Sequence, residues 1–112
     1  MIYTSYFNKY KGKDGISVAN YMPKRYMAAE MVYLATKWSH VSSFKANLIS
    51  EEEFKVHYLN QLSQLDPIKV FNDLDGSVIL CWEKSHQFCH RFILAEWLRS
   101  HNISVDTKTY ED

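Results

Sequence analysis

A continuous apolar run, Ser77 to Trp82, constrains the fold of this chain more than any other segment. A strand that is apolar on both faces is typical of the centre of a parallel sheet, where layers on both sides cover it. The run is followed by a helix with apolar residues at helical spacing, Cys89 to about Ser100, and by the alternating segment Ile103 to Thr107. Strand, helix and strand in this order predict a right-handed crossover between parallel strands.

Two further helices are indicated by their start signals. Ser50-Glu51-Glu52-Glu53 is a capping box, in which the first hydroxyl and the last carboxylate satisfy each other's free backbone N–H groups. Asp66-Pro67 ends that helix and starts another, with Asp66 as the N-cap and Pro67 at the first helical position. We expect this second helix to run to about Leu74.

The first third of the chain supplies the remaining elements. Strands are expected at Met1–Thr4 and Ile16–Ala19, and helical spacing of apolar residues predicts a helix from Met27 to Trp38. With 112 residues, of which 46% are apolar, the chain has the size of one domain with one core. The prediction is therefore a single α/β domain spanning 1–112, a small three-layer Rossmann-like fold with a mostly parallel sheet.

Charge and hydropathy exclude some classes of partner. The formal net charge is zero, so there is no strong case for a protein that binds nucleic acid through many phosphate contacts. No apolar stretch approaches the roughly 18 residues of a membrane span, and no signal peptide is expected. We therefore expect a cytoplasmic protein without a membrane segment, in which the two cysteines are thiols rather than a structural bridge. Their separation would still permit a transient disulfide.

Reactive side chains are concentrated at the end of the apolar strand and the start of the last helix. Two thiols, a carboxylate, two imidazoles and a guanidinium lie within eleven positions: Cys81, Glu83, His86, Cys89, His90 and Arg91. Open parallel sheets bind ligands at this kind of strand-to-helix turn. A helix N-terminus carries partial positive charge, and the fork of Arg91 suits phosphate or carboxylate, so the two together predict an anion site.

The same positive field favours the thiolate of Cys89, which makes it the better candidate nucleophile, whereas Cys81 inside a strand is expected to be a core residue. Glu83 is a candidate general base, but an ion pair between Glu83 and Arg91 is equally compatible with the sequence. For His90 we expect a hydrogen-bonded residue that supports the loop.

Spacing argues against two sharper interpretations of this segment. A cysteine-dependent phosphatase needs its cysteine six positions before the arginine, and neither Cys81 nor Cys89 has that separation from Arg91. Structural zinc sites pair ligands two to four residues apart in two separate loops, and only one such cluster is present. No metal is therefore expected.

The segment resembles a known signature. Leu80-Cys81-Trp82-Glu83 together with Phe88 to Leu98, which contains Cys89-His90-Arg91, is similar to the "LCxE…CHRxxxAxxL" pattern of the domain of unknown function 488 family of bacteria, archaea and phages. The similarity extends to Ile2–Tyr6, to Ile16–Val18 and to Phe44 through Leu62. One departure is the stretch Leu34–Trp38, where family members would be expected to have a proline soon after Ala35.

The resemblance implies an α/β fold and a site at the cysteine, glutamate and Cys-His-Arg loop, with no agreed substrate. If it holds, further polar residues should face the same crevice. These are Thr4, Ser5 and Tyr6 at the end of the first strand, Ser17 to Asn20 at the end of the second, and Lys24, Arg25 and Lys45 at the outer rim.

Three hypotheses of function follow. The leading one is a protein that binds, and in one version processes, a small anionic or nucleotide-like molecule, with Arg91, His90, Ser5, Tyr6, Ser17, Lys24 and Arg25 as binding residues and Glu83 and Cys89 as catalytic residues. The second is a non-catalytic interaction or sequestration protein of phage or mobile-element origin, whose eight tyrosines contact a partner or a second copy. The third is a thiol redox-responsive protein that uses Cys81 and Cys89. None of the three identifies a cofactor.

Overall fold

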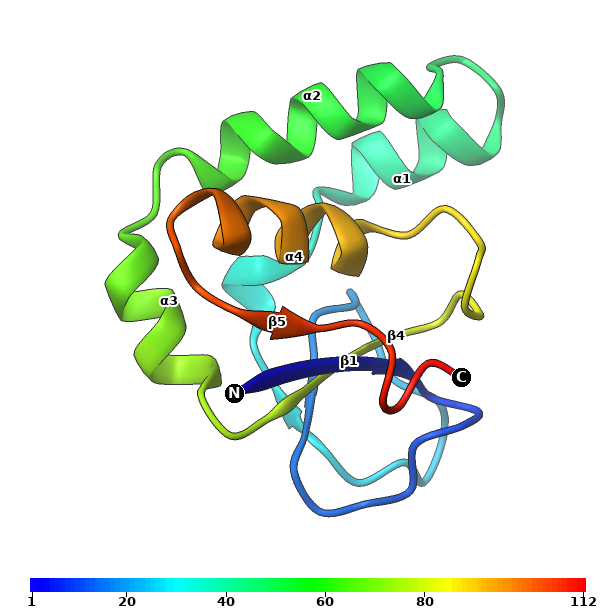
Figure 1. Cartoon of the computed structure of the whole chain (residues 1–112). Coiled ribbons are helices and arrows are strands. Elements are labelled where there is room, and N and C mark those ends of the chain that lie inside the picture. The colour runs from blue at the N-terminus through cyan, green and yellow to red at the C-terminus, as the bar shows by residue number, and fades with distance from the viewer.

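Five parallel strands form a single sheet in the computed structural model, which describes residues 1–112 (Figure 1). The strand order is β3-β2-β4-β1-β5, and every neighbouring pair is parallel. The strands are β1 (Ile2–Tyr6), β2 (Gly15–Ser17), β3 (Ala29–Glu30), β4 (Val78–Cys81) and β5 (Val105–Asp106). The predicted α/β class with a parallel sheet is confirmed.

The apolar run identified in the sequence is the middle strand. β4 lies between β1 and β2, with Ile79 opposite Thr4 on one side and Ile16 on the other. All four residues of β4 are buried, as a strand covered on both faces requires. The chain leaves β4, passes through α4 and returns as β5 beyond β1, so this connection crosses over β1.

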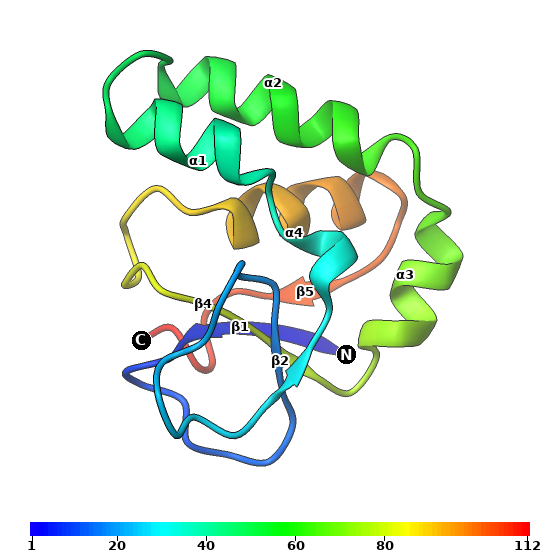
Figure 2. The ribbon, with the colours of Figure 1, turned by 180° about the vertical axis from the view of Figure 1, so that it is seen from behind.

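Four α-helices accompany the sheet: α1 (Trp38–Lys45), α2 (Glu51–Leu62), α3 (Pro67–Leu74) and α4 (His90–Ser100). Figures 1 and 2 show that α4 lies next to the sheet, that α1 and α2 lie beyond it on the same side, and that loops 7–14 and 21–28 take the other side. The layer opposite the helices therefore consists of loops. Phe7 and Tyr26 pack edge to face there, with ring centroids 5.0 Å apart.

The predicted helix from Met27 to Trp38 is wrong. This stretch contains strand β3, a single 3-10 turn η1 (Val32–Leu34) and extended backbone at Lys37, and helix α1 only begins at Trp38. The edge of the sheet competes with helix formation, because residues 29–31 hydrogen-bond to β2, including Met31 N–H to the Ser17 carbonyl. Helical spacing of apolar residues did not outweigh these partners.

The helix start signals behave as predicted. Ser50 and Glu53 form both hydrogen bonds of the capping box at α2, and the Asp66 carboxylate accepts a hydrogen bond from Ile68 N–H at α3. After α4, Asn102 adopts the left-handed conformation with φ of 64°. No helix combines the length and the apolar character that crossing a membrane would need.

Candidate functional site

A largely apolar cavity of about 250 Å³ opens where β2 and β4 end and α4 begins. Ten of its fifteen lining residues are hydrophobic, and its aromatic walls come from loops and from α1 and α2: Tyr21, Trp38, Phe44, Phe54, Trp82 and Phe88. The polar or reactive groups at the wall include Cys81, Glu83, Cys89 and His90, with Lys45 as a cation. We refer to this cavity as the thiol pocket. Its position is the one that parallel sheets use for ligands.

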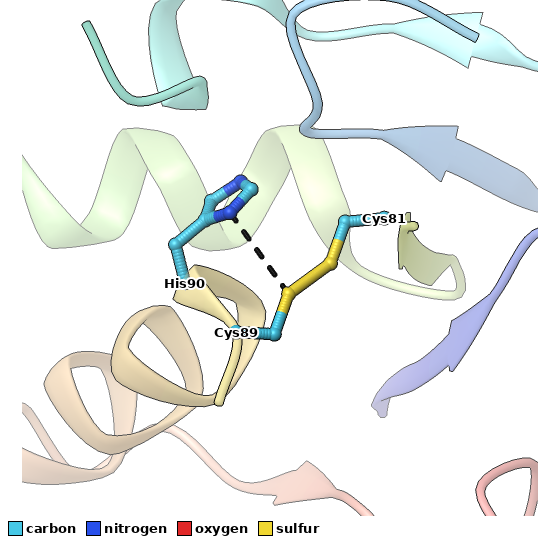
Figure 3. A group of neighbouring side chains, drawn as sticks. All are labelled: Cys81, Cys89 and His90. Atoms are coloured by element: carbon cyan, nitrogen blue, oxygen red, sulfur yellow. Dashed lines mark hydrogen bonds between the residues drawn. A yellow bond between two sulfur atoms is a disulfide. The ribbon is translucent and has the colours of Figure 1, made fainter. Parts of the chain in front are cut away.

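A disulfide joins Cys81 to Cys89 at the wall of this pocket (Figure 3). Cys81 is the last residue of β4, and Cys89 is the N-cap of α4, so the bond closes the loop between strand and helix. Both residues are buried, and no other cysteine exists in the chain. The structure describes the pair in the disulfide form that the sequence left open as a transient state, because the loop folds the helix start back onto the end of the strand.

His90 is the first residue of α4 and points its ring toward the sulfur atoms (Figure 3). Its Nε2 lies 2.7 Å from the Val18 carbonyl, which can only accept, so Nε2 carries the proton. The other nitrogen, Nδ1, is 3.9 Å from Cys89 Sγ. Exclusion of water from the ring lowers the pKa of His90 to about 4, with a further contribution from the charge of Arg91. The imidazole is therefore neutral at pH 7, with the Nδ1 lone pair facing the sulfur.

These three residues bring potential metal ligands together. The ligand atoms of Cys81, Cys89 and His90 all lie within 4.8 Å of one another. Sequence spacing argued against a structural zinc site because two ligand pairs in separate loops are usual. The fold instead gathers one ligand from a strand end and two from a helix start, and His86 is not part of the group.

Arg91 lies behind the pocket wall and is fully buried. Its Nε and Nη2 donate to the two carboxylate oxygens of Glu111 at 2.9 and 2.8 Å, which is a bidentate ion pair. Its Nη1 lies 3.1 Å from Cys81 Sγ and donates to the Glu83 carbonyl at 2.6 Å. Arg91 does not line the pocket, so the guanidinium acts on it through the pocket residues Cys81 and Glu83.

Glu111 completes a buried polar group around Arg91, and neither Glu111 nor Ser85 was predicted from the sequence. The Thr4 hydroxyl donates to Glu111 Oε2, and the Ser85 hydroxyl lies 2.6 Å from Oε1. We refer to Thr4, Ser85, Arg91 and Glu111 as the Arg91 cluster. Burial alone would raise the pKa of Glu111, but hydrogen bonds from Arg91, Ser85 and Thr4 outweigh it and the pKa lies below its usual value. No motif marks a glutamate after the last strand, because its partner is twenty positions away.

The structure excludes one of the two interpretations of Glu83. Its carboxylate does not pair with Arg91, since only its backbone carbonyl accepts from the guanidinium. The side chain instead lines the thiol pocket, with Oε2 3.7 Å from Cys81 Sγ. The predicted alternative of a Glu83–Arg91 ion pair is therefore wrong, because Glu111 occupies that position.

Ser5 and Tyr6, at the end of β1, lie close to the Arg91 cluster, and Ser17 is the last residue of β2. The Ser5 hydroxyl donates to the Tyr110 carbonyl at 2.7 Å, and the ring of Tyr6 lies 5.7 Å from Cζ of Arg91. Ser17 is buried, and its hydroxyl accepts from Ala19 N–H at 3.3 Å. None of these three lines the thiol pocket.

Lys24 and Arg25 are separated from the other predicted residues. They line a shallow depression on the loop side, together with Lys11 and Tyr26, and do not line the thiol pocket. Of the three predicted rim cations, Lys45 alone reaches the pocket. The predicted crevice is therefore divided into the thiol pocket, the Arg91 cluster and this basic depression.

Comparison of the chain with family models, with curated proteins and with solved structures found no match. The resemblance to the domain of unknown function 488 family therefore stays a prediction, based on the sequence motif around Cys81 and Cys89.

Proposed function

We propose that this protein is a thiol–disulfide protein in which Cys81 and Cys89 react with small disulfides or thiols that enter the apolar pocket. The observation that supports this most is that the bonded pair, although buried in the core, also forms part of the pocket wall. A structural bridge needs no cavity beside it. Aromatic walls favour a reactant that carries a flat or apolar group.

The two sulfurs have different surroundings in the reduced state. A guanidinium N–H lies 3.1 Å from Cys81 Sγ and favours the thiolate there. Cys89 Sγ lies near the neutral Nδ1 of His90 and at the start of α4. Cys81 is therefore the attacking sulfur and Cys89 the resolving one. The sequence favoured Cys89 as the nucleophile, but the fold directs Arg91 to the other cysteine.

The reaction balances as two successive exchanges. The Cys81 thiolate attacks a disulfide RSSR, forms a mixed disulfide and releases one thiolate RS⁻. Cys89 then loses its proton to solvent or to RS⁻ and attacks the Cys81 sulfur, which releases the second RS⁻. The two cysteines lose two electrons and the oxidant gains them, so the products are the Cys81–Cys89 disulfide and two thiols.

An aromatic disulfide tests this proposal directly. Fully reduced protein is mixed with one equivalent of 5,5′-dithiobis(2-nitrobenzoic acid), whose released thiolate is coloured. We expect two equivalents of released thiolate and a protein mass lower by two hydrogens than the reduced form. The ratio of the rates with this reagent and with an aliphatic disulfide such as hydroxyethyl disulfide should be larger for the protein than for a small free thiol, because the aliphatic reagent gains less from the aromatic walls.

The single cysteine variants assign the two roles. Cys89→Ser should stop at a mixed disulfide on Cys81 with one equivalent released, whereas Cys81→Ser should react more slowly because Cys89 has no guanidinium contact. If the native reduced protein is unreactive and both thiols react only in urea, the pair is a buried structural bridge and the proposal fails.

The leading hypothesis from the sequence, binding of an anionic or nucleotide-like molecule at Arg91, remains a prediction. The geometry favours the thiol pair over it because the donors of Arg91 are already used by Glu111, Cys81 and the Glu83 carbonyl. Lys45 is the cation that an anionic substituent of a pocket ligand would meet. The hypothesis of an interaction or sequestration protein, with a second copy as one partner, also stays a prediction.

A further inference from the structure

The arrangement of Cys81, Cys89 and His90 also suits the binding of a metal ion by the two sulfur atoms and the imidazole. Figure 3 shows the imidazole and the two sulfurs directed toward one point between the end of β4 and the start of α4. Their ligand atoms lie within 4.8 Å of one another, and they line the thiol pocket. Two thiolates and one imidazole nitrogen are a ligand set that zinc prefers.

The histidine is already held as a metal ligand would be. Ligating histidines nearly always donate their other ring N–H to a carboxylate, a carbonyl or water, which fixes the tautomer and the ring orientation. In this structure the Val18 carbonyl accepts from Nε2 at 2.7 Å, so Nδ1 presents its lone pair toward Cys89 Sγ. A buried carbonyl contributed by the loop after β2 therefore provides the outer partner.

Once the sulfur–sulfur bond is reduced, a small separation of the two sulfurs brings the three ligand atoms to the distances of a tetrahedral ion. Zinc bonds of about 2.3 Å to sulfur and 2.0 Å to nitrogen place a sulfur and a nitrogen ligand of a tetrahedron about 3.5 Å apart and two sulfur ligands about 3.8 Å apart. The distance from Cys89 Sγ to His90 Nδ1 is 3.9 Å. Two thiolates neutralise the charge of the ion, and the N–H of Arg91 at 3.1 Å from Cys81 Sγ is an outer hydrogen bond to a ligand sulfur.

We propose that the reduced protein binds one zinc ion through Cys81 Sγ, Cys89 Sγ and His90 Nδ1, with the fourth position facing the thiol pocket. This inference depends on the proposed function only in requiring that the disulfide can be reduced. Three protein ligands with an open fourth position are the arrangement of catalytic rather than structural zinc sites. Glu83 lies beside that position, with its carboxylate 3.7 Å from Cys81 Sγ.

Metal binding and disulfide formation exclude each other because they use the same electron pairs. When Zn²⁺ binds, thiols that are still protonated release their protons to solvent, up to two in all. When a small disulfide RSSR oxidises the site, the two cysteines lose two electrons, RSSR becomes two thiols and the zinc ion is released. The site therefore changes between a metal-bound reduced state and a metal-free oxidised state.

The experiment uses the full chain, reduced and kept free of oxygen, with a thiol count of two verified first. Zinc chloride is titrated against a chromogenic chelator, and native mass spectrometry gives the stoichiometry. We expect one zinc ion per chain, and with cobalt chloride we expect the thiolate-to-metal charge-transfer absorption of a sulfur-bound ion. Addition of 5,5′-dithiobis(2-nitrobenzoic acid) should release the metal.

Variants separate this ligand set from other sites. Cys81→Ser, Cys89→Ser and His90→Gln should each weaken zinc binding by more than the roughly 10–100-fold that loss of an outer partner costs. The matched control is His86→Asn, which removes the other imidazole of the same loop at a position whose φ of 69° asparagine tolerates. It should leave the affinity unchanged. Circular dichroism checks that each variant is folded.

The outcomes distinguish this inference from the proposed function. If both thiols are free and exchange with the aromatic disulfide but no zinc or cobalt binds, the metal site is wrong and the thiol–disulfide function stands. If zinc binds but the two thiols fail to form a disulfide with the same reagent, the metal site stands and the redox function fails. Binding that survives in His90→Gln, or disappears in His86→Asn, overturns the ligand set.

Discussion

The Arg91 cluster and the thiol pocket lie on either side of Cys81 and differ in polarity and in packing. In the Arg91 cluster, a buried cation and a buried carboxylate face each other directly, and no buried side-chain nitrogen or oxygen of the protein lacks a hydrogen-bond partner. In the thiol pocket, most of the wall is apolar, and a cavity of about 250 Å³ lies beside the sulfurs and the imidazole. Cys81 Sγ belongs to both, through Arg91 on one side and Cys89 on the other.

This difference assigns separate tasks to the two regions. Removing one partner of a buried ion pair leaves an uncompensated charge, so the contacts of Glu111 with Arg91 and Thr4 hold the segment containing Glu111 against β1 and α4. The pocket has no such requirement, because apolar walls tolerate water or a ligand. The cluster therefore positions the reactive sulfur, and the pocket gives a small molecule access to it.

The largest effect is expected from removing one member of the buried ion pair. Glu111→Ala leaves Arg91 buried without its partner, which should lower the free energy of unfolding by roughly 3–5 kcal/mol. Urea unfolding at pH 7 measures this loss. The control Asp112→Ala removes an exposed carboxylate next in sequence and should change stability by less than about 0.5 kcal/mol. A loss below about 1 kcal/mol for Glu111→Ala would show that the cluster does not hold the fold.

As the pH is lowered, protonation of His90 at the thiol pocket should be the first of these two regions' contributions to reduce the stability of the fold. The folded protein has a His90 pKa of about 4 against 6.5 for the unfolded chain, so below pH 6.5 the unfolded state takes up the proton first. Stability should therefore be complete above pH 6.5 and decline as the pH falls toward 4, by about 3 kcal/mol. The measurement is the free energy of unfolding of the metal-free disulfide form against pH.

The variant His90→Gln isolates this contribution. It should reduce the loss of stability between pH 6.5 and 4, whereas the depressed pKa of Glu111 acts at more acidic pH in both proteins. Parallel pH profiles for the wild type and the variant would mean that His90 titrates as freely in the folded protein as in the unfolded chain.

An intermediate effect is expected from the aromatic wall. Phe88 packs against Phe44 and Phe54 with ring centroids 5.2 and 5.5 Å apart, and it is only partly buried. Phe88→Ala should lower the free energy of unfolding by about 2 kcal/mol and slow the reaction with the aromatic disulfide more than with the aliphatic one. Equal slowing of both reagents would argue that the wall does not contact the reactant.

The smallest effect comes from one hydroxyl of the Arg91 cluster. Thr4→Val keeps the shape of the buried side chain but removes its hydrogen bond to Glu111, which should cost about 1.5 kcal/mol. The rate of exchange with the aromatic disulfide should stay the same, because Thr4 does not line the pocket. A changed rate with unchanged stability would show that the two regions are not separate in function.

Local signals predicted the elements that depend on neighbouring residues. The capping box at Ser50, the Asp66-Pro67 start and the buried run before Cys81 each satisfy their own backbone or bury their own side chains, and all three form as expected. The stretch from Met27 to Trp38 did not follow its spacing, because its hydrogen-bond partners lie on β2. Short elements at a sheet edge are decided by such distant partners.

The candidate site likewise combines features set by neighbouring residues with features set by residues far apart in the sequence. The sequence by itself determined a parallel α/β domain and the placement of Cys81, Glu83, Cys89 and His90 at one strand-to-helix turn, since these residues are close in the chain. Only the tertiary structure decided that Arg91 contacts the sulfur of Cys81 and forms its ion pair with Glu111. It also decided that Lys24 and Arg25 lie in the basic depression and not at the thiol pocket. Charge pairing acts through space, and for ions that lie in different elements, such as Arg91 and Glu111, the sequence separation carries no information about their distance in the fold.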